Sequence, residues 1–213
     1  MVQIYNDRVE AANILSESLR AMRDHADIIV LGLVREGMAV AAEVARELHL
    51  PLDIFLVQKI SSPRLKERAI APVSGGGAVV LTDDTCKRYG PGREEMAGPL
   101  RSEYNLLVER ERAYRSKFSK MPVEDKTVII TDDGMTTGNS MKVAATALRE
   151  EGAANVIVAV PVASPGAMQS LQGWADDVKC PLTPEKFASV SRSYRHYAEM
   201  TDRDVEVLLR AAR

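Results

Sequence analysis

The chain has 213 residues, enough for one sizeable hydrophobic core, so we expect a single domain over residues 1–213. Apolar residues make up 46% and charged residues 27%, proportions that exclude a disordered chain, and the net charge of −2 argues against nucleic acid as the principal partner. Two cysteines and three histidines, all far apart, exclude a disulfide framework and a thiolate or imidazole metal site. No apolar run of about 18 residues and no export signal is present, so we expect a cytoplasmic protein without a membrane partner.

The amino-terminal quarter of the chain alternates helical and strand-like patterns. Apolar residues recur at helical spacing over residues 7–24. Short apolar runs at 28–33 and 52–58 predict two strands, and residues 38–48 between them have the spacing of a helix. A strand, a helix and a strand within about thirty residues form a βαβ unit, which favours a parallel sheet with helices on its faces.

The same alternation resumes after an irregular excursion. Glycines and prolines interrupt residues 59–92, where one strand-like run occupies 78–82, and a charged helix is predicted over 93–117. Two further strand–helix pairs follow. Strands are predicted at residues 127–131 and 155–163, and each precedes a helix, at 140–151 and 166–174. A last helix is predicted over 202–212. The sequence therefore predicts an α/β fold, doubly wound, with a mainly parallel sheet and helices on both faces.

The segment 132–140 follows a predicted strand and precedes a predicted helix, at the edge of the sheet where open α/β folds bind ligands. It places two acids, Asp132 and Asp133, before a loop rich in glycine and hydroxyl groups. Glycines allow the loop to turn tightly, and successive N–H groups at a helix start attract a phosphate. Carboxylates repel phosphate but bind hydroxyl groups or hydrated Mg²⁺. The pattern predicts a site for ribose 5-phosphate, with the phosphate at Thr136, Thr137 and Ser140.

A purely structural interpretation of these residues is the alternative. The acids can cap a turn, and Thr137 or Ser140 can cap the helix, a device that contributes about 1 kcal/mol without any ligand. We favour function because acids, glycines and hydroxyl groups occur together at the functional edge of the sheet. The segment matches neither the P-loop nor the dinucleotide fingerprint, and Gly134 replaces the second acid of an Asp-x-Asp phosphatase pair.

The sequence VIITDDGMTTGNSM, residues 128–141, resembles the phosphoribosyl-pyrophosphate (PRPP) signature of the type I phosphoribosyltransferases. The similarity covers nearly the whole chain, which resembles a bacterial group described only as predicted phosphoribosyltransferases. The resemblance implies an enzyme that uses PRPP and Mg²⁺, in which Asp132 and Asp133 form the catalytic pair that holds the ribose hydroxyls and the metal. It assigns the 5′-phosphate to Gly134, Thr136, Thr137, Gly138, Asn139 and Ser140.

A second family element, the pyrophosphate loop, falls by position at residues 34–37. Arg35 can pair with pyrophosphate oxygens, and Gly37 permits close approach of the backbone. Glu36 departs from the glycine that similar proteins carry, and a carboxylate beside pyrophosphate is repulsive. Either Glu36 points away and Mg²⁺ mediates, or the chain binds pyrophosphate poorly. Lys59, after the next strand, matches a basic position near the leaving group, with a solvated surface lysine as the alternative.

The resemblance also implies accessory parts around the site. Residues 61–114 correspond to a flap-like insertion that closes over the reacting centre, and residues 181–213 correspond to a C-terminal hood over the acceptor. A homodimer is the expected assembly. Candidate contacts are Arg64, Lys66 and Arg68 for pyrophosphate, and Phe187, Tyr194 and Tyr197 for the acceptor. Arg112 or Arg115 could also turn toward the site. A solvated or salt-bridged surface is the alternative for the charged residues, and core packing is the alternative for the aromatic ones.

The implied function is transfer of the 5-phosphoribosyl group of PRPP to a nitrogen nucleophile, with release of pyrophosphate, in nucleotide metabolism or salvage. Thr136 stands where purine-salvage members carry an acid, which disfavours hypoxanthine and guanine as acceptors. Glu36 supports one alternative, a non-catalytic PRPP- or nucleotide-sensing regulatory protein on the same fold. An RNA-binding regulator would need a basic face that the net charge does not indicate.

Overall fold

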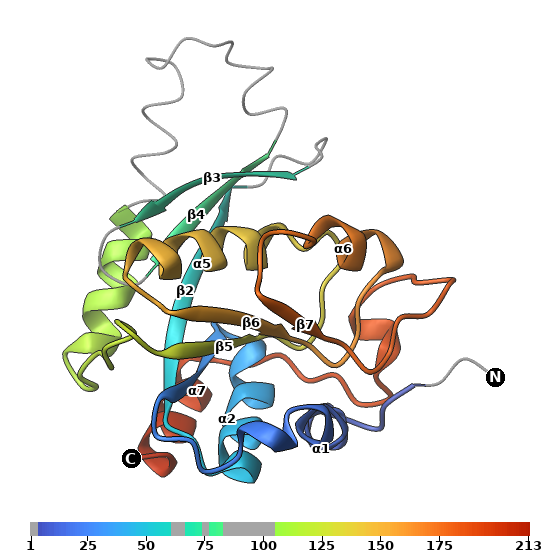
Figure 1. Cartoon of the computed structure of the whole chain (residues 1–213), viewed down its shortest axis with the longest axis horizontal. Coiled ribbons are helices and arrows are strands. Elements are labelled where there is room, and N and C mark those ends of the chain that lie inside the picture. The colour runs from blue at the N-terminus through green and yellow to red at the C-terminus, as the bar shows by residue number, and fades with distance from the viewer. Residues whose placement is uncertain (1–3, 61–66, 74–76, 83–104) are drawn as a thin grey trace, which may run out of the picture.

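A seven-stranded sheet forms the centre of the molecule, in the order β3-β4-β2-β1-β5-β6-β7 (Figure 1). The computed structural model describes residues 4–60, 67–73, 77–82 and 105–213, and for residues 58–60, 67–73 and 77–82 it describes the backbone alone. All neighbouring strands pair in parallel except β3 and β4, which are antiparallel. The mainly parallel sheet predicted from the sequence is confirmed.

The described elements alternate along the chain as a doubly wound fold requires. The strands are β1 (Ile28–Leu33), β2 (Leu52–Ile60), β3 (Glu67–Val73), β4 (Gly77–Thr82), β5 (Thr127–Thr131), β6 (Asn155–Ala159) and β7 (Asp177–Lys179). The helices are α1 (Arg8–Ser18), α2 (Gly37–Leu48), α5 (Asn139–Glu150), α6 (Pro165–Ser170) and α7 (Asp202–Ala211), and residues 105–115 are also helical. Short 3-10 turns occupy Arg20–Met22 and Ser191–Ser193.

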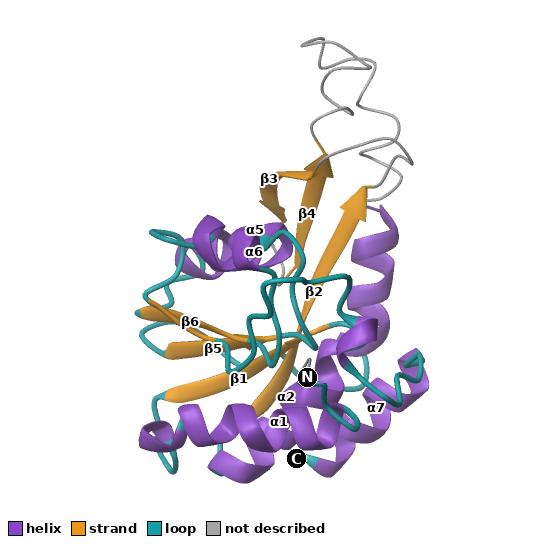
Figure 2. Ribbon diagram, turned by 90° about the vertical axis from the view of Figure 1, so that its right-hand side faces the viewer, coloured by secondary structure: helices purple, strands orange, loops and turns teal. Residues whose placement is uncertain are grey.

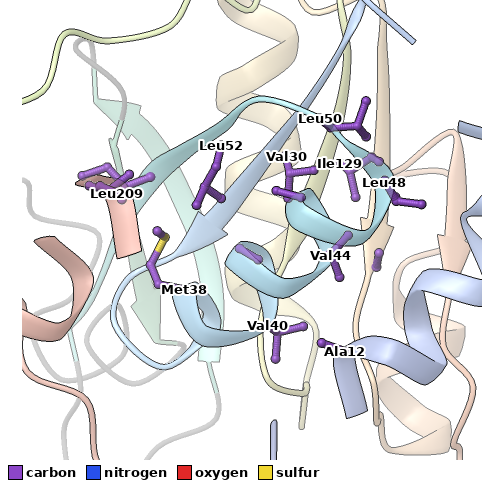
Figure 3. Packing of buried hydrophobic residues seen from close by; sticks show 14 of the residues in the cluster. Ala12, Val30, Met38, Val40, Val44, Leu48, Leu50, Leu52, Ile129 and Leu209 are labelled. Carbon is purple, nitrogen blue, oxygen red and sulfur yellow. The ribbon is translucent and has the colours of Figure 1, made fainter. Parts of the chain in front are cut away.

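Helices cover both faces of the sheet (Figure 2). On one face, α1, α2 and α7 pack on the sheet, and Figure 3 shows Val40 and Val44 of α2 in the same cluster as Val30 of β1 and Ile129 of β5. On the other face, α5 and α6 pack over a second buried cluster. Because both faces are covered, β1 is buried along its whole length, which explains its uninterrupted apolar sequence IIVLGL. Each large side chain buried this way contributes about 1.5–3 kcal/mol.

The winding of the chain changes direction between β1 and β5, which are parallel neighbours. After β1 the chain crosses to α2 on one face of the sheet, and after β5 it crosses to α5 on the opposite face. The loops that follow these two strands therefore diverge at the carboxyl edge of the sheet. In open α/β sheets such a switch point leaves the crevice in which ligands bind.

Several element boundaries differ from the sequence predictions for identifiable reasons. The helix predicted over 7–24 ends at Ser18, where serine hydroxyls bond to carbonyls of the preceding turn, and the chain continues as a 3-10 turn. The strand predicted over 155–163 ends at Ala159, because Pro161 lacks a backbone N–H and the following residues make only isolated bridges. The helix predicted over 166–174 spans only Pro165–Ser170.

The sequence did not predict two of the observed strands. The edge strand β3 contains a proline, which an edge strand tolerates, and β7 has only three residues. Most of the flap predicted over 61–114 lies outside the described residues, including Arg64 and Lys66. The side chains of Lys59 and Arg68 are likewise not described. In the described part of the chain, every helix is too short or too polar to cross a membrane.

Candidate functional site

A cleft of about 410 Å³ opens at the switch point of the sheet. Its floor and walls are residues 132–141, which connect β5 to α5 and form the first turn of that helix. Glu36, from the loop after β1, and Val190 and Tyr197, from the tail, complete the lining. The structure therefore brings together residues of the loop after β1, the segment 132–141 and the tail, which lie far apart in the sequence.

The loop before α5 is accessible and presents polar groups to the cleft. The side chains of Thr136 and Thr137 are exposed, and Asn139 and Ser140 are half-buried. Gly138 is the N-cap of α5, and its φ of 77° lies in the left-handed region that favours glycine. Gly138 has no side chain that could cap α5, and the Asn139 backbone N donates to Thr137 Oγ1 at 3.5 Å. Because the first turn of α5 lines the cleft, the positive end of the helix dipole lies at the cleft. This arrangement suits a phosphate monoester.

Asp132 lies at the opposite end of this segment, between the cleft and the N-terminus of α2. Its side chain is half-buried, and its Oδ1 accepts a hydrogen bond from the Asp133 backbone N at 2.9 Å. A Cβ atom at Gly37 would lie 2.8 Å from the same oxygen, so only glycine lets α2 approach this closely. The adjacent helix N-terminus favours a charged carboxylate at this position.

Asp133 has a different environment, although it is the next residue. It is 5% exposed, and its Oδ2 accepts hydrogen bonds from Arg8 Nε at 3.0 Å and Nη2 at 2.9 Å. The Tyr197 side chain also interacts with this carboxylate. Burial raises the pKa of Asp133, an effect that Tyr197 and Arg8 oppose and the charge of Glu36 reinforces.

Arg8 connects this acid to the tail, a role that the sequence analysis did not identify. Its Nη1 donates to the Ala198 carbonyl oxygen at 2.6 Å, and its guanidinium lies 4.1 Å from the centre of the Tyr197 ring. Tyr5, three residues earlier, exchanges backbone hydrogen bonds with Ser193 and Arg195. Arg8, at the start of α1, therefore binds both the Asp133 carboxylate and the backbone of the tail.

The loop after β1 contributes unequally to the cleft. The peptide bond between Val34 and Arg35 is cis, and Glu36 is one of the residues that line the cleft. Arg35 is exposed and lies outside the cleft lining, near Asp202 at the start of α7. Burial acts to raise the pKa of Asp202, but the net shift is downward. The pKa is lowered by hydrogen bonds from Arg110 and Tyr114 and by the positive charges of Arg110 and Arg35.

The remaining predicted contacts divide between the cleft and the core. Tyr197 lines the cleft, whereas Tyr194 is buried and its hydroxyl donates to the Asp133 backbone carbonyl. Phe187 packs against the small cluster that contains Tyr5 and Tyr194. Arg115 does not reach the cleft, because its Nη1 is bound 2.8 Å from Asp53 Oδ1 on β2, as the salt-bridge alternative predicted.

Comparisons with known proteins place the chain in a family. A family model described as the phosphoribosyl transferase domain matches residues 3–195. A candidate phosphoribosyl transferase of Mycobacterium tuberculosis is 32% identical over 208 residues, which cover 98% of this chain and 47% of that protein. The chain thus spans about half the length of the first curated relatives it matches.

Two other relatives agree with this assignment. A uracil phosphoribosyltransferase of Staphylococcus haemolyticus is 28% identical over 149 residues, which cover 67% of this chain and 68% of that protein. The crystal structure of a Thermus thermophilus protein superimposes with a TM-score of 0.75 at 31% identity and covers 97% of both chains. From the family match, the relatives and the cleft at the switch point, we conclude that this chain belongs to the phosphoribosyl transferase domain family.

Proposed function

We propose that the cleft binds PRPP with Mg²⁺ and that the chain transfers its 5-phosphoribosyl group to a nitrogen nucleophile with release of pyrophosphate. One observation carries the proposal: a single cleft has exposed hydroxyls and helix amides at one end and the half-buried carboxylate of Asp132 at the other. The first end fits a phosphate monoester, and the second fits ribose hydroxyls or a hydrated cation. Membership of the family supports the reaction type.

Crystals grown with ribose 5-phosphate should show its phosphate over the start of α5. We expect the phosphate oxygens within hydrogen-bonding distance of the amides of residues 136–140, because these groups line the open cleft. A structure at a resolution that resolves the phosphorus atom is the measurement. A fully bound ligand with its phosphate elsewhere would contradict the assignment of this loop.

Mg²⁺ fits the donors that the chain offers. Among the described residues, no group of three or more His, Cys, Asp or Glu side chains could hold a metal ion alone. Mg²⁺ commonly keeps several waters and takes one or two carboxylates together with substrate oxygens. Asp132 and Glu36, which line the same cleft, would hold it in this way, with Asp133 as a further proposed ligand. When bound, the cation would neutralise charge on the pyrophosphate and on Glu36.

The chain itself supplies positioning and a negative field. Departure of pyrophosphate leaves positive charge on the ribose ring in the transition state, and the carboxylate of Asp132 stabilises that charge. The phosphate loop anchors the other end of the ribose, which orients C1 toward the acceptor. Arg35 and Lys59 are proposed partners of the departing pyrophosphate, and Gly37 keeps the loop that carries Arg35 against Asp132.

The accessory parts of this proposal are a flap, a hood and a homodimer. We assign the flap to residues 61–114 and the hood to residues 181–213. The position of Val190 and Tyr197 in the cleft lining supports a hood, since both belong to the tail. A nitrogenous base bound next to the ribose would contact these two side chains. A role in nucleotide metabolism or salvage follows from such an acceptor.

The position of Glu36 favours a second candidate function, a PRPP- or nucleotide-sensing protein without catalysis. Glu36 lines the cleft, and a carboxylate there repels pyrophosphate unless Mg²⁺ intervenes. Calorimetry with PRPP and Mg²⁺, followed by a pyrophosphate-release assay over a panel of bases and amines, separates the two functions. Binding with release for at least one acceptor supports the transferase, and tight binding without release for any acceptor supports the sensor.

We expect hypoxanthine and guanine to be poor acceptors. The exposed Thr136 stands where a carboxylate would be needed to take a proton from the purine ring, and a threonine hydroxyl is a poor base. Acceptors that need no proton removal by this loop, such as a pyrimidine anion or an amine, should react faster. The name of one relative, a uracil phosphoribosyltransferase, supports this choice. Steady-state assays with PRPP and Mg²⁺ measure it. Rapid turnover of guanine that survives Thr136→Val would overturn the argument.

A further inference from the structure

Three successive carbonyl groups of the loop before α5 are bound from outside the cleft. The Met135 oxygen accepts from the Ser164 backbone N at 3.0 Å. The Thr136 oxygen accepts from Ser164 Oγ at 2.7 Å, and the Thr137 oxygen accepts from Ser170 Oγ at 2.9 Å. Both serines belong to α6 or its N-cap, and neither lines the cleft.

These hydrogen bonds determine the direction of the amide groups that follow each carbonyl. In a planar trans peptide, the C=O of one residue and the N–H of the next point in opposite directions. The one cis peptide bond among the described residues follows Val34, so the peptides of this loop are trans. Because the carbonyls of residues 135–137 point toward α6, the N–H groups of Thr136, Thr137 and Gly138 point away from α6, toward the cleft.

The two serines are well placed for this role. Ser164 Oγ accepts a hydrogen bond from Ala167 N at 3.0 Å, which caps α6, and uses its own hydrogen to bind the Thr136 carbonyl. Ser170 Oγ lies 2.9 Å from the Thr137 oxygen and 2.9 Å from the Ala167 oxygen, so its one hydrogen is shared between these two carbonyl groups. It also lies 2.9 Å from the position that a Cβ of Gly138 would take. A carbonyl that accepts a hydrogen bond also polarises its peptide group, which makes the N–H a stronger donor.

We propose that Ser164 and Ser170 are positioning residues that turn the amides of residues 136–138 into a preformed phosphate site. The inference rests on the proposed function, because it identifies what gives that cleft its affinity for a 5′-phosphate. Without these hydroxyls the two peptide groups can rotate, and the phosphate must then order the loop as it binds.

Calorimetric titration with ribose 5-phosphate tests the proposal. Ser164→Ala and Ser170→Ala should each raise the dissociation constant by about three- to tenfold, the effect of one hydrogen bond, and the double variant should raise it by more than about tenfold. Ser164→Thr keeps both hydrogen bonds and should bind as the unmodified chain does. The matched control is Ser116→Ala, whose hydroxyl bonds to the Ala113 carbonyl on a distant helix in the same way, and it should leave the dissociation constant unchanged.

Ser164→Asp distinguishes positioning from general stability. Aspartate can still cap α6, but a carboxylate cannot donate to the Thr136 carbonyl. We expect an unchanged unfolding midpoint with weakened binding that persists at high salt, where the added charge is screened. If α6 merely stabilises the fold, the aspartate variant should bind normally and the alanine variants should lose only thermal stability. That result, with normal binding by the unmodified chain, would overturn this inference alone. Failure of the unmodified chain to bind ribose 5-phosphate would overturn the proposed function as well.

Discussion

Replacing Arg8 by methionine should lower the free energy of unfolding by about 3–5 kcal/mol, the usual cost of breaking a buried ion pair from one side. The side chains of Arg8 and Asp133 are 8% and 7% exposed, so water cannot replace the missing partner. Methionine keeps an apolar contact with the Tyr197 ring, which separates the loss of charge from the loss of packing. Denaturation in urea, followed by circular dichroism, measures the change.

The cost of this substitution should depend on pH. Burial raises the pKa of Asp133, and removal of the guanidinium would raise it further. A raised carboxyl pKa means that the folded state binds more protons than the unfolded state, so stability falls as the pH rises above the ordinary value of about 3.9. The loss of unfolding free energy caused by Arg8→Met should therefore be smaller at about pH 4 than at about pH 8.

The chain offers a matched control in Arg20→Met. Arg20 follows α1 closely, and the side chains of its ion pair with Glu17 are 72% and 71% exposed. An exposed pair of this kind contributes little, so the control should change stability by no more than about 0.5 kcal/mol at any pH. Equal and pH-independent losses in the two variants would show that the Arg8 contact is not a buried pair.

Asp132→Asn should weaken Mg²⁺-dependent binding of PRPP by about 10- to 100-fold, because contacts to a charged group contribute about 1.5–3 kcal/mol. Asparagine keeps the Oδ1 atom that accepts from the Asp133 backbone N, so the fold should be retained. Calorimetry with and without Mg²⁺ measures the effect, and denaturation checks the fold. Unchanged affinity in a folded variant would refute the proposed role of this carboxylate.

Two further variants sharpen this test. Asp177→Asn is the matched control, since Asp177 Oδ1 accepts from the next backbone N at 2.8 Å in the same way but lies on β7, outside the cleft lining. It should bind PRPP normally. Asp133→Asn should mainly lower stability, because it leaves the guanidinium of Arg8 buried without its anion. Burial of Asp133 therefore makes a double asparagine variant a poor test of binding.

Much of the fold could be predicted from the sequence because the central strands have strong local signals. The apolar runs of β1 and β5 each begin directly after a charged residue, Asp27 and Lys126, and their predicted and observed limits agree. The loop after β5 was located in the same way, from acids, glycines and hydroxyls at a strand end. Strand β3 was missed because its proline and flanking glycines are typical of irregular structure.

The separate environments of the two acids could not be predicted from their local sequence. Asp132 and Asp133 are identical in type and adjacent, and neighbouring side chains of an extended segment point to opposite sides. Both border the cleft, but Asp132 lies beside α2, whereas the carboxylate of Asp133 is bound by Arg8 of α1. The partner of Asp133 is 125 residues away in the chain, and nothing in the sequence around Arg8 distinguishes it from an ordinary surface arginine. The sequence also gave no reason to single out Ser164 or Ser170, which act on backbone carbonyls.

The contacts of Arg8 have a consequence for the order in which the molecule folds. They join residues separated by 125 and 190 positions, so each contact closes a long loop of the chain. Closing such a loop costs conformational entropy before the contact itself can stabilise the fold. A ribosome adds about 5–20 residues per second, so the central strands and α5 leave the ribosome seconds before Ala198 does. During that interval the nascent chain can pair its parallel strands but cannot close the tail over the cleft. A ligand that binds in the completed cleft could therefore assist only the last stage of folding, after the tail has emerged.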